Sequence, residues 1–358
     1  MNIKYFVIIS LVFSSLIAQD TLRQKALNKG LTPIPKDLQI LKNQVDDPDN
    51  PITIPKIILG KKLFFDKNLS KDKTISCASC HDLKKGGEDS IPTAIGYKKL
   101  KNPSHLNTPT VLNTAYSKHF FWNARVTTLR EQAKGPIQAH FEMASTPKLV
   151  VNRVKKNLDY QKQFKNIFGD NSITFDNITK SIAVYEKTLV TRSKFDDFLE
   201  GDEDALSALE KRGLNLFIDM GCKGCHYGPT IGGQRVQKFP LRDYNSFLNL
   251  TTTFNEKTKG RSLKSISLNF KMYQPFPFEN KGEFLGQNNE KKFRVPILRN
   301  ISQTAPYYHN GAIKTLREAI KIMSKYQVGV DMSKEQLDAM EAFLKSLDGE
   351  IVKYDRIN

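Results

Sequence analysis

The chain of 358 residues contains only four cysteines and one tryptophan, and it has few stretches that alternate like β-strands. The cysteines occur as two close pairs, so none remains for a disulfide framework that joins distant segments. An apolar run near the N-terminus covers residues 5–17, which is shorter than the roughly 20 residues of a transmembrane helix. Arginine accounts for 13 of the 55 basic residues. Because arginine is the side chain that contacts phosphates and bases in bidentate fashion, we expect no nucleic-acid partner.

Both cysteine pairs belong to the same five-residue motif, in which a histidine follows the second cysteine. The two copies consist of Cys77, Cys80 and His81, and of Cys222, Cys225 and His226. Two thiols at this spacing can bind a haem covalently, and the adjacent imidazole can ligate its iron. A zinc site or a redox dithiol also uses close cysteine pairs, but zinc needs further ligands at short spacing, which neither pair has beyond its one histidine. We therefore predict two covalently bound c-type haems.

An internal repeat accompanies the two motifs. The pattern Gly-x-x-Leu-Phe occurs at residues 60–64 before the first motif and at residues 213–217 before the second. Glycine costs about 1 kcal/mol inside a helix, so its recurrence predicts a close helix crossing in each half. Each half also ends in an amphipathic helix, near residues 178–189 and 337–347. These features predict a mostly α fold of two tandem cytochrome c-like haem domains with long loops, at residues 45–200 and 201–358.

The N-terminus has the pattern of a secretory signal peptide. Lys4 precedes the apolar run, and the small residue Ala18 stands before a polar segment. We expect residues 1–18 to be removed on export and residues 19–44 to form a leader, with no membrane span in the mature chain. Bacteria attach haem to such motifs on the far side of the inner membrane, so we expect a periplasmic protein.

The chain is strongly basic. Its formal charge is +18, and removal of residues 1–18 takes away Lys4 alone, so 18 − 1 leaves +17. Such a charge favours an acidic redox partner through long-range attraction. The alternative is that the lysines reflect composition and only form a solvated surface.

The residues between and after the haem motifs resemble the bacterial di-haem cytochrome c peroxidase family, from about residue 51 to residue 347. The matching runs are TPTVLN at 108–113, FWNAR at 121–125, QAKGP at 132–136 up to Glu142, VPILRN at 295–300, TAPYYHNG at 304–311, and Met323. The resemblance implies reduction of hydrogen peroxide to water at the N-terminal haem. The electrons would come from a small donor protein, a cytochrome c or a copper protein, and enter at the C-terminal haem.

Peroxide reduction requires an acid/base group that moves a proton from one oxygen to the other. The resemblance assigns this role to Glu142 and makes Gln132 the amide that orients peroxide, although a lone glutamate is otherwise a solvated helix residue. It places Trp122 between the haems as an electron path. His81 would ligate the first iron. His226 and Met323 would ligate the second, whose potential a thioether raises.

The resemblance also implies a calcium ion at the domain boundary, held by the Asn107 side chain and by carbonyl groups of Thr304 and Pro306. Oxygen ligands from two domains suit this hard cation. His309 is expected to pack near the second haem without ligating it. Members of the family are often dimeric, so a homodimer is also expected by analogy.

The chain departs from the family pattern at Tyr97, where many members carry a histidine that blocks the first iron in the resting enzyme. A phenol titrates near pH 10, so we expect an open first haem that reacts with peroxide without prior reduction. His105, eight residues further along, is the competing ligand.

Two other functions remain open from the sequence. The first is an enzyme that oxidises a protein to form a tryptophan-derived quinone, and that relative has a tyrosine where Met323 stands. The second is an electron carrier or redox sensor without turnover, against which Gln132 and Glu142 argue.

Overall fold

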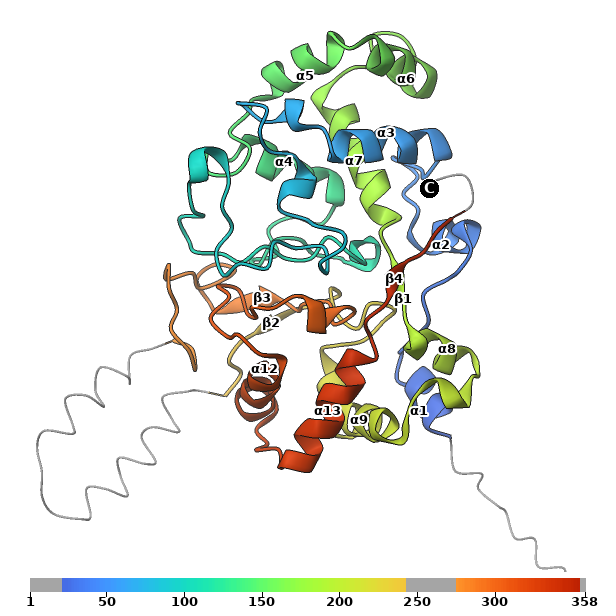
Figure 1. The fold of residues 1–358 in the computed structure, drawn as a ribbon, viewed down its shortest axis with the longest axis vertical. Helices are drawn as coiled ribbons and strands as arrows, with labels where there is room; N and C mark the ends of the chain where they lie inside the picture. The colour runs from blue at the N-terminus through green and yellow to red at the C-terminus, as the bar shows by residue number, and fades with distance from the viewer. Residues whose placement is uncertain (1–20, 243–274, 355–358) are drawn as a thin grey trace, which may run out of the picture.

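The computed structural model describes residues 21–242 and 275–354, and it is built from short helices joined by long loops (Figure 1). The expected signal peptide at residues 1–18 lies outside the described residues. The α-helices are α1 (Leu22–Asn28), α2 (Leu38–Val45), α3 (Ile54–Phe64), α4 (Leu129–Gln138), α5 (Pro147–Lys155), α6 (Leu158–Phe168), α7 (Phe175–Lys187), α8 (Lys194–Glu200), α9 (Ala208–Asp219), α12 (Leu316–Met323) and α13 (Lys334–Lys345). None of the helices within residues 21–242 and 275–354 is long and apolar enough to cross a membrane.

Shorter elements complete the described chain. Single-turn helices are η1 (Lys67–Leu69), η2 (Cys77–Ser79), η3 (Tyr97–Lys99), η4 (Thr114–Tyr116), η5 (Glu203–Ala205), η6 (Cys222–Gly224), η7 (Ile301–Gln303) and the π-helical η8 (Ser324–Val328). The strands are β1 (Thr191–Arg192), β2 (Val236–Lys238), β3 (Lys292–Arg294) and β4 (Glu350–Ile351). They form two antiparallel pairs, β1 with β4 and β2 with β3. The expectation of a mostly α fold is confirmed.

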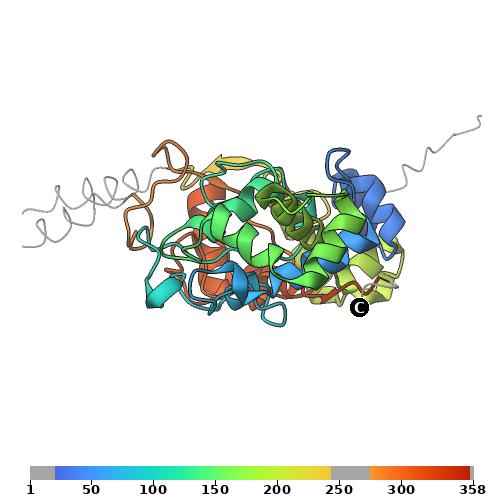
Figure 2. The same ribbon diagram turned by 90° about the horizontal axis from the view of Figure 1, so that it is seen from above.

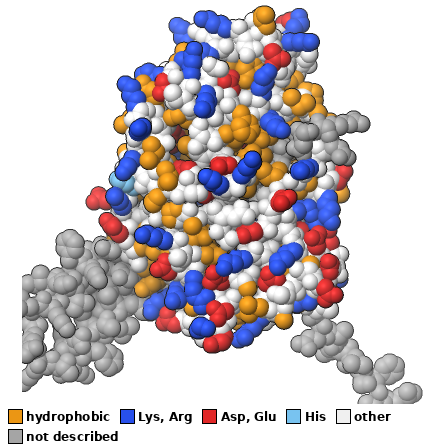
Figure 3. All heavy atoms as spheres, viewed as in Figure 1, with side chains coloured by type: hydrophobic (Ala, Val, Ile, Leu, Met, Phe, Trp, Pro, Cys, Tyr) orange, Lys and Arg blue, Asp and Glu red, His pale blue; other side chains and the backbone are white. Residues whose placement is uncertain are grey.

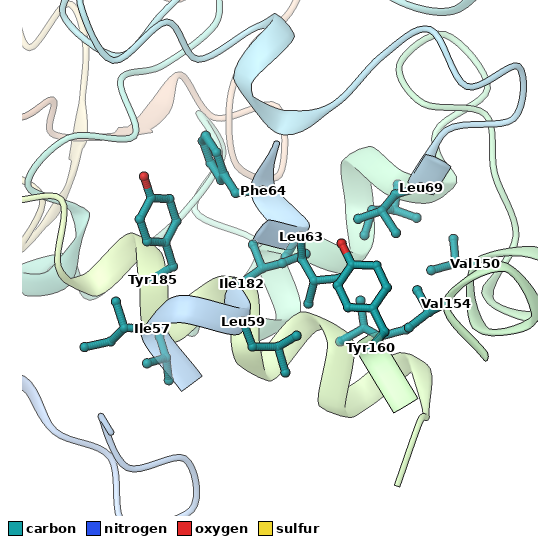
Figure 4. Close-up of a cluster of buried hydrophobic side chains, with 14 of the residues drawn as sticks. Ile57, Leu59, Leu63, Phe64, Leu69, Val150, Val154, Tyr160, Ile182 and Tyr185 are labelled. Carbon is teal, nitrogen blue, oxygen red and sulfur yellow. The ribbon is translucent and has the colours of Figure 1, made fainter. Parts of the chain in front are cut away.

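The first hydrophobic core lies where α3 crosses α7. Leu59, Leu63 and Phe64 of α3 pack against Ile182 and Tyr185 of α7 (Figure 4). A side chain at residue 60 would overlap the carbonyl oxygen of residue 181, so the two backbones approach as closely as glycine allows. The close crossing predicted for the first half is confirmed.

The second core repeats this arrangement with α9 and α13. A Cβ atom at Gly213 would overlap the carbonyl oxygen of Ala339 and contact Phe343. Capping boxes at Ser207 and Ser333 fix where the two helices begin. The second predicted crossing is therefore also confirmed.

Two segments before the expected boundary at residue 201 pack into the second core. Ala26 of α1 and three residues of α8, Phe195, Phe198 and Leu199, are buried there. In Figure 1 the two groups of helices lie at opposite ends of the long axis, with loops of the first half between them, and in Figure 2, which looks along that axis, the two groups overlap. The leader thus packs against the second core, and the precise domain limits stay a prediction.

A fully buried ion pair fixes α8 to the second half. Both carboxylate oxygens of Asp196 lie 2.7 Å from the guanidinium of Arg299, and both side chains are inaccessible to solvent. Asp196 also accepts a hydrogen bond from the backbone N–H of Ile34 at 2.8 Å. Such a bidentate pair tolerates burial because its partners satisfy each other's hydrogen bonds.

We predict that Gly213→Ala destabilises the protein by about 1–3 kcal/mol, the usual cost of overpacking a core, because the new methyl group meets the backbone of α13. Urea unfolding of the haem-loaded protein measures this. Arg212→Ala, at the exposed neighbouring position on α9, is the control. Equal stability of the two variants would contradict the close crossing.

Candidate functional site

The first cavity is centred on the first cysteine motif and has a volume of about 340 Å³, within the range of pockets that bind cofactors, about 300–1,000 Å³. Cys77, Cys80 and His81 line it, as do Gln132 and Glu142. The structure thus brings the predicted attachment residues and the predicted peroxide residues to one space.

The ring of His81 is held by the loop that follows it. Its Nδ1 lies 3.0 Å from the carbonyl oxygen of Gly87, so Nδ1 carries the proton in this bond and Nε2 is left with its lone pair. Burial lowers the pKa of His81, which favours the neutral ring that a metal requires. The residue therefore fits the expected role of iron ligand.

Glu142 is held in place through its backbone. Its carbonyl oxygen accepts a hydrogen bond from the N–H of Tyr97 at 2.7 Å, and a Cβ at Gly96 would overlap this segment. Burial raises the pKa of Glu142 to about 6, and the Arg125 guanidinium opposes this rise. A carboxyl group with a pKa near neutrality can both accept and donate a proton.

The second cavity has a volume of about 390 Å³ and contains the second motif, Cys222, Cys225 and His226, together with Met323. The Nδ1 of His226 lies 3.3 Å from the carbonyl oxygen of Ile231, so the ring is oriented as in the first site. Thr315 caps the first turn of α12, whose last residue is Met323. The helix thus places a thioether at the wall of the cavity that holds the second histidine.

The two cavities share a wall. The residues that line both are Asn107, Thr108, Pro109, Thr110, Trp122 and Arg294. The indole N–H of Trp122 donates to the carbonyl oxygen of Asn107 at 2.8 Å, and its own carbonyl oxygen accepts from the N–H of Arg294 at 3.0 Å. Two bonds therefore fix the single tryptophan between the cavities, where the sequence predicted it.

Arg294 was not among the predicted site residues. Its side chain is buried, burial lowers its pKa to about 10, and among the described residues its Nε has no hydrogen-bond partner. A buried cation is stabilised by an anion, and the propionate carboxylates of a bound haem would supply that charge. The cysteine and histidine geometry of both cavities, and this arginine in the wall that they share, fit a haem.

The internal repeat extends through this wall with a constant spacing of 187 residues. Asn113 and Asn300 both have left-handed backbones, and the bridge Phe120–Val126 recurs as Tyr307–Ile313. The same spacing relates the N-cap Thr128 of α4 to the N-cap Thr315 of α12.

The same spacing of 187 matches Met323 with Pro136, and each is the eighth residue of its helix. Proline has no side-chain donor, so the position that carries a thioether in the second cavity carries no ligand in the first. From the sequence, Pro136 stood out only as part of the QAKGP motif. An alignment of the two halves on Asn113 and Asn300 matches it with Met323.

Neither candidate for the resting ligand lines the first cavity. The ammonium groups of Lys71 and Lys98 lie 5.5 and 5.4 Å from the centroid of the Tyr97 ring. The Nδ1 of His105 lies 3.5 Å from the hydroxyl of Thr93. This placement favours an open first haem, which stays a prediction.

The three predicted calcium ligands, Asn107, Thr304 and Pro306, all line the second cavity. The amide NH₂ of Asn107 donates to the carbonyl oxygen of Ile91 at 2.9 Å, which turns its side-chain oxygen to the other side. No cluster of three His, Cys, Asp or Glu side chains able to hold a metal occurs among residues 21–242 and 275–354.

Two cavities, each with a Cys-x-x-Cys-His motif in its wall, define a tandem c-type haem protein. The family model described as di-haem cytochrome c peroxidase matches residues 55–204. The cytochrome c551 peroxidase of Nitrosomonas europaea is 40% identical over 295 residues, 82% of this chain and 79% of that protein. That of Pseudomonas aeruginosa is 37% identical, covering 95% of this chain and 90% of the relative.

The chain belongs to the di-haem cytochrome c peroxidase family, and the predicted enzyme class is confirmed by these relatives. The methylamine utilization protein MauG of Methylorubrum extorquens is also similar, with 38% identity over 88% of this chain and 86% of that protein. A crystal structure of a MauG-like protein associated with microbial copper homeostasis superposes with a TM-score of 0.70 at 26% identity, covering 87% of this chain and 95% of that one.

We predict that the rate of the reaction with peroxide falls as the pH drops through about 6, because the raised pKa of Glu142 leaves its carboxyl protonated below that point. In Arg125→Gln the charge that lowers this pKa is gone, so the midpoint of the fall moves to higher pH. Stopped-flow absorbance against pH measures it. Arg130→Gln, whose arginine pairs with Glu131 and Asp176 instead, keeps the wild-type midpoint. A midpoint that Arg125→Gln leaves unchanged would separate this arginine from Glu142.

Proposed function

We propose that this protein reduces hydrogen peroxide to water at the first haem, with electrons that enter at the second haem. The observation that supports this most is the asymmetry of two related cavities. The first contains Gln132 and Glu142 and has Pro136 where the second has Met323. An acid/base pair beside an open position suits turnover, and a closed ligand set suits electron storage.

In the first site Cys77 and Cys80 would hold the haem and His81 would ligate its iron. The haem supplies an iron that binds peroxide and transfers electrons to it. The overall reaction takes one peroxide, two electrons and two protons to two waters. Glu142 accepts a proton from one peroxide oxygen and returns it to the other, while the Gln132 NH₂ group donates a hydrogen bond that orients peroxide and stabilises developing charge.

In the second site Cys222 and Cys225 would hold the haem, with His226 and Met323 as the axial ligands. A thioether ligand raises the reduction potential, so this site accepts electrons from a donor readily. Trp122, fixed in the wall that both cavities share, is the proposed path between them.

The donor we propose is a small redox protein, a cytochrome c or a copper protein, in the periplasm. Two relatives are named cytochrome c551 peroxidases, which supports a cytochrome donor. Lysine and arginine side chains are scattered over the face seen in Figure 3, among acidic, apolar and other polar groups. The net charge of +18 supports an acidic partner, whereas this scattered arrangement fits a solvated surface equally well.

We also propose the calcium ion at Asn107, Thr304 and Pro306. Their presence in the lining of one cavity supports it, since Asn107 comes from the first half and the other two come from the second. Bound there, the ion would couple the packing of the halves to the haem pair. A homodimer remains a proposal by analogy with the family.

Formation of a quinone cofactor is the second candidate function, because MauG proteins are among the relatives. Met323 in the wall of the second cavity favours the peroxidase, since the quinone-forming relative has tyrosine there. A peroxide assay with a reduced small cytochrome distinguishes the two. Steady oxidation of the cytochrome supports the proposal, and binding of peroxide without turnover of the cytochrome would overturn it.

We predict that Glu142→Gln retains both haems and slows peroxide reduction by about 100-fold or more, the usual effect of losing a general acid/base. Turnover with a reduced cytochrome measures this, and the haem spectrum shows that the protein is loaded. Glu131→Gln, on the same segment but paired with Lys134 outside the cavity, is the matched control. Turnover within a few-fold of wild type in Glu142→Gln would remove this residue from the mechanism.

We predict that Met323→His lowers the potential of the second haem by more than about 0.1 V, a fraction of the roughly 0.8 V that axial ligands span. Imidazole stabilises ferric iron more than a thioether does. A spectroelectrochemical titration measures the change. Met332→Leu, another methionine of the same cavity, retains the wild-type couple. If Met332→Leu and not Met323→His shifts the potential, the ligand has been assigned to the wrong methionine.

A further inference from the structure

Glu186, near the end of α7, is a buried acid that the proposed reaction does not use. It lines the first cavity, and its side chain is only 5% exposed. Among the described residues its Oε2 has no hydrogen-bond partner. Burial of a carboxylate without a hydrogen-bond partner costs free energy, so such a residue points to a functional role.

The helix crossings identify its counterpart in the second half. A Cβ at Gly60 would meet Ser181 and Tyr185, and one at Gly213 would meet Ala339 and Phe343. Ser181 and Ala339 differ by 158 in residue number, and so do Tyr185 and Phe343. The same difference of 158 matches Glu186 with Leu344. Leu344 is 6% exposed and lines the second cavity. The two haem sites therefore differ at one matched wall position, with an acid in the first and a leucine in the second.

Among the described residues, no charged side chain forms an ion pair with the acid. Burial raises its pKa to about 8. Seven cations on α7 and on the helices that pack against it have other partners: Lys56 contacts Asn50, Lys62 contacts Asp159, Arg130, Lys134 and Lys180 contact Asp176, Arg153 contacts the carbonyl groups of Asn68 and Lys71, and Lys187 contacts that of Val45. Lys148 and Lys155 on α5 are exposed. The thiol of Cys77 is close enough for its pKa to be raised in part by Glu186.

We propose that Glu186 is a redox-linked proton site for the first haem: its carboxylate binds one proton when the haem gains one electron, and releases that proton when the electron leaves. The inference goes beyond the proposed peroxidase function and rests only on a haem attached at Cys77. Solvent supplies and receives the proton. No bond other than the carboxyl O–H forms or breaks.

Electrostatics gives the direction of the coupling. Ferric haem carries one more positive charge than ferrous haem, and it therefore stabilises a nearby carboxylate more. The proton affinity of Glu186 rises on reduction, and the ionised acid in turn favours the ferric state. The carboxyl group therefore has a lower pKa beside ferric haem than beside ferrous haem. Between these two pKa values, the reduction potential of the first haem must fall as the pH rises. The second haem has Leu344 at this position and lacks this source of pH dependence.

The test is a spectroelectrochemical titration of both haems in the loaded protein between pH 6 and pH 10, without peroxide. We expect the wild-type first couple to fall near pH 8 with a slope approaching 59 mV per unit, one proton per electron. Glu186→Gln, which keeps the size and removes the titration, and Glu186→Leu, which copies the second site, both flatten this slope. Glu131→Gln retains it, because Glu131 lies outside the cavity and pairs with Lys134.

A second measurement guards against variants that load poorly. Redox-difference infrared spectra of the wild type are expected to show a protonated carboxyl C=O band on reduction that is absent in Glu186→Gln. A slope that persists unchanged in loaded Glu186→Gln overturns the proposal, as does a wild-type couple that is flat over this range. Because no peroxide is present, either result leaves the proposed peroxidase function untouched, and failure of turnover leaves this inference untouched.

Discussion

The structure depends on two helix crossings at which glycine lets the backbones touch. Gly60 meets α7 and Gly213 meets α13, and in both cases a methyl group would overlap a carbonyl oxygen. Each crossing fixes one helix that leads into a haem motif and one that forms a wall of the cavity beside it. Because the contact is between backbones, it fixes the register along the helix as well as the distance. Wall residues such as Glu186 and Leu344 occupy matched places for this reason.

On this repeated frame the two sites differ at a few positions that control chemistry. Pro136 replaces the thioether of Met323, and Trp122 stands where the second half has His309. Glu142 gives the first cavity an acid/base group, and the second cavity is lined by apolar side chains near its thioether. The proposed open coordination in the first site and closed coordination in the second would thus arise from one arrangement by local substitution.

Motifs and periodicity predicted the haem attachment residues and both glycine crossings. The family resemblance predicted the roles of Gln132 and Glu142, which the structure places in one cavity. The sequence did not indicate Arg294 or Glu186, because a single charged residue in a helix or strand reads as solvated until burial is known. The packing of α1 and α8 into the second core was also not foreseen. Those contacts join segments far apart in the chain, and local patterns carry no information about them.

Arg294 and Glu186, the two site residues that the sequence did not indicate, are both charged and buried. Both line the first cavity, and among the described residues Arg294 Nε and Glu186 Oε2 have no hydrogen-bond partner. A carboxylate of the bound cofactor would stabilise the cation. No described cation pairs with the acid, so in the proposed coupling its charge follows that of the iron. The two buried groups in this cavity therefore have different proposed roles: Arg294 would bind a carboxylate of the haem, and Glu186 would gain or lose a proton as the haem gains or loses an electron.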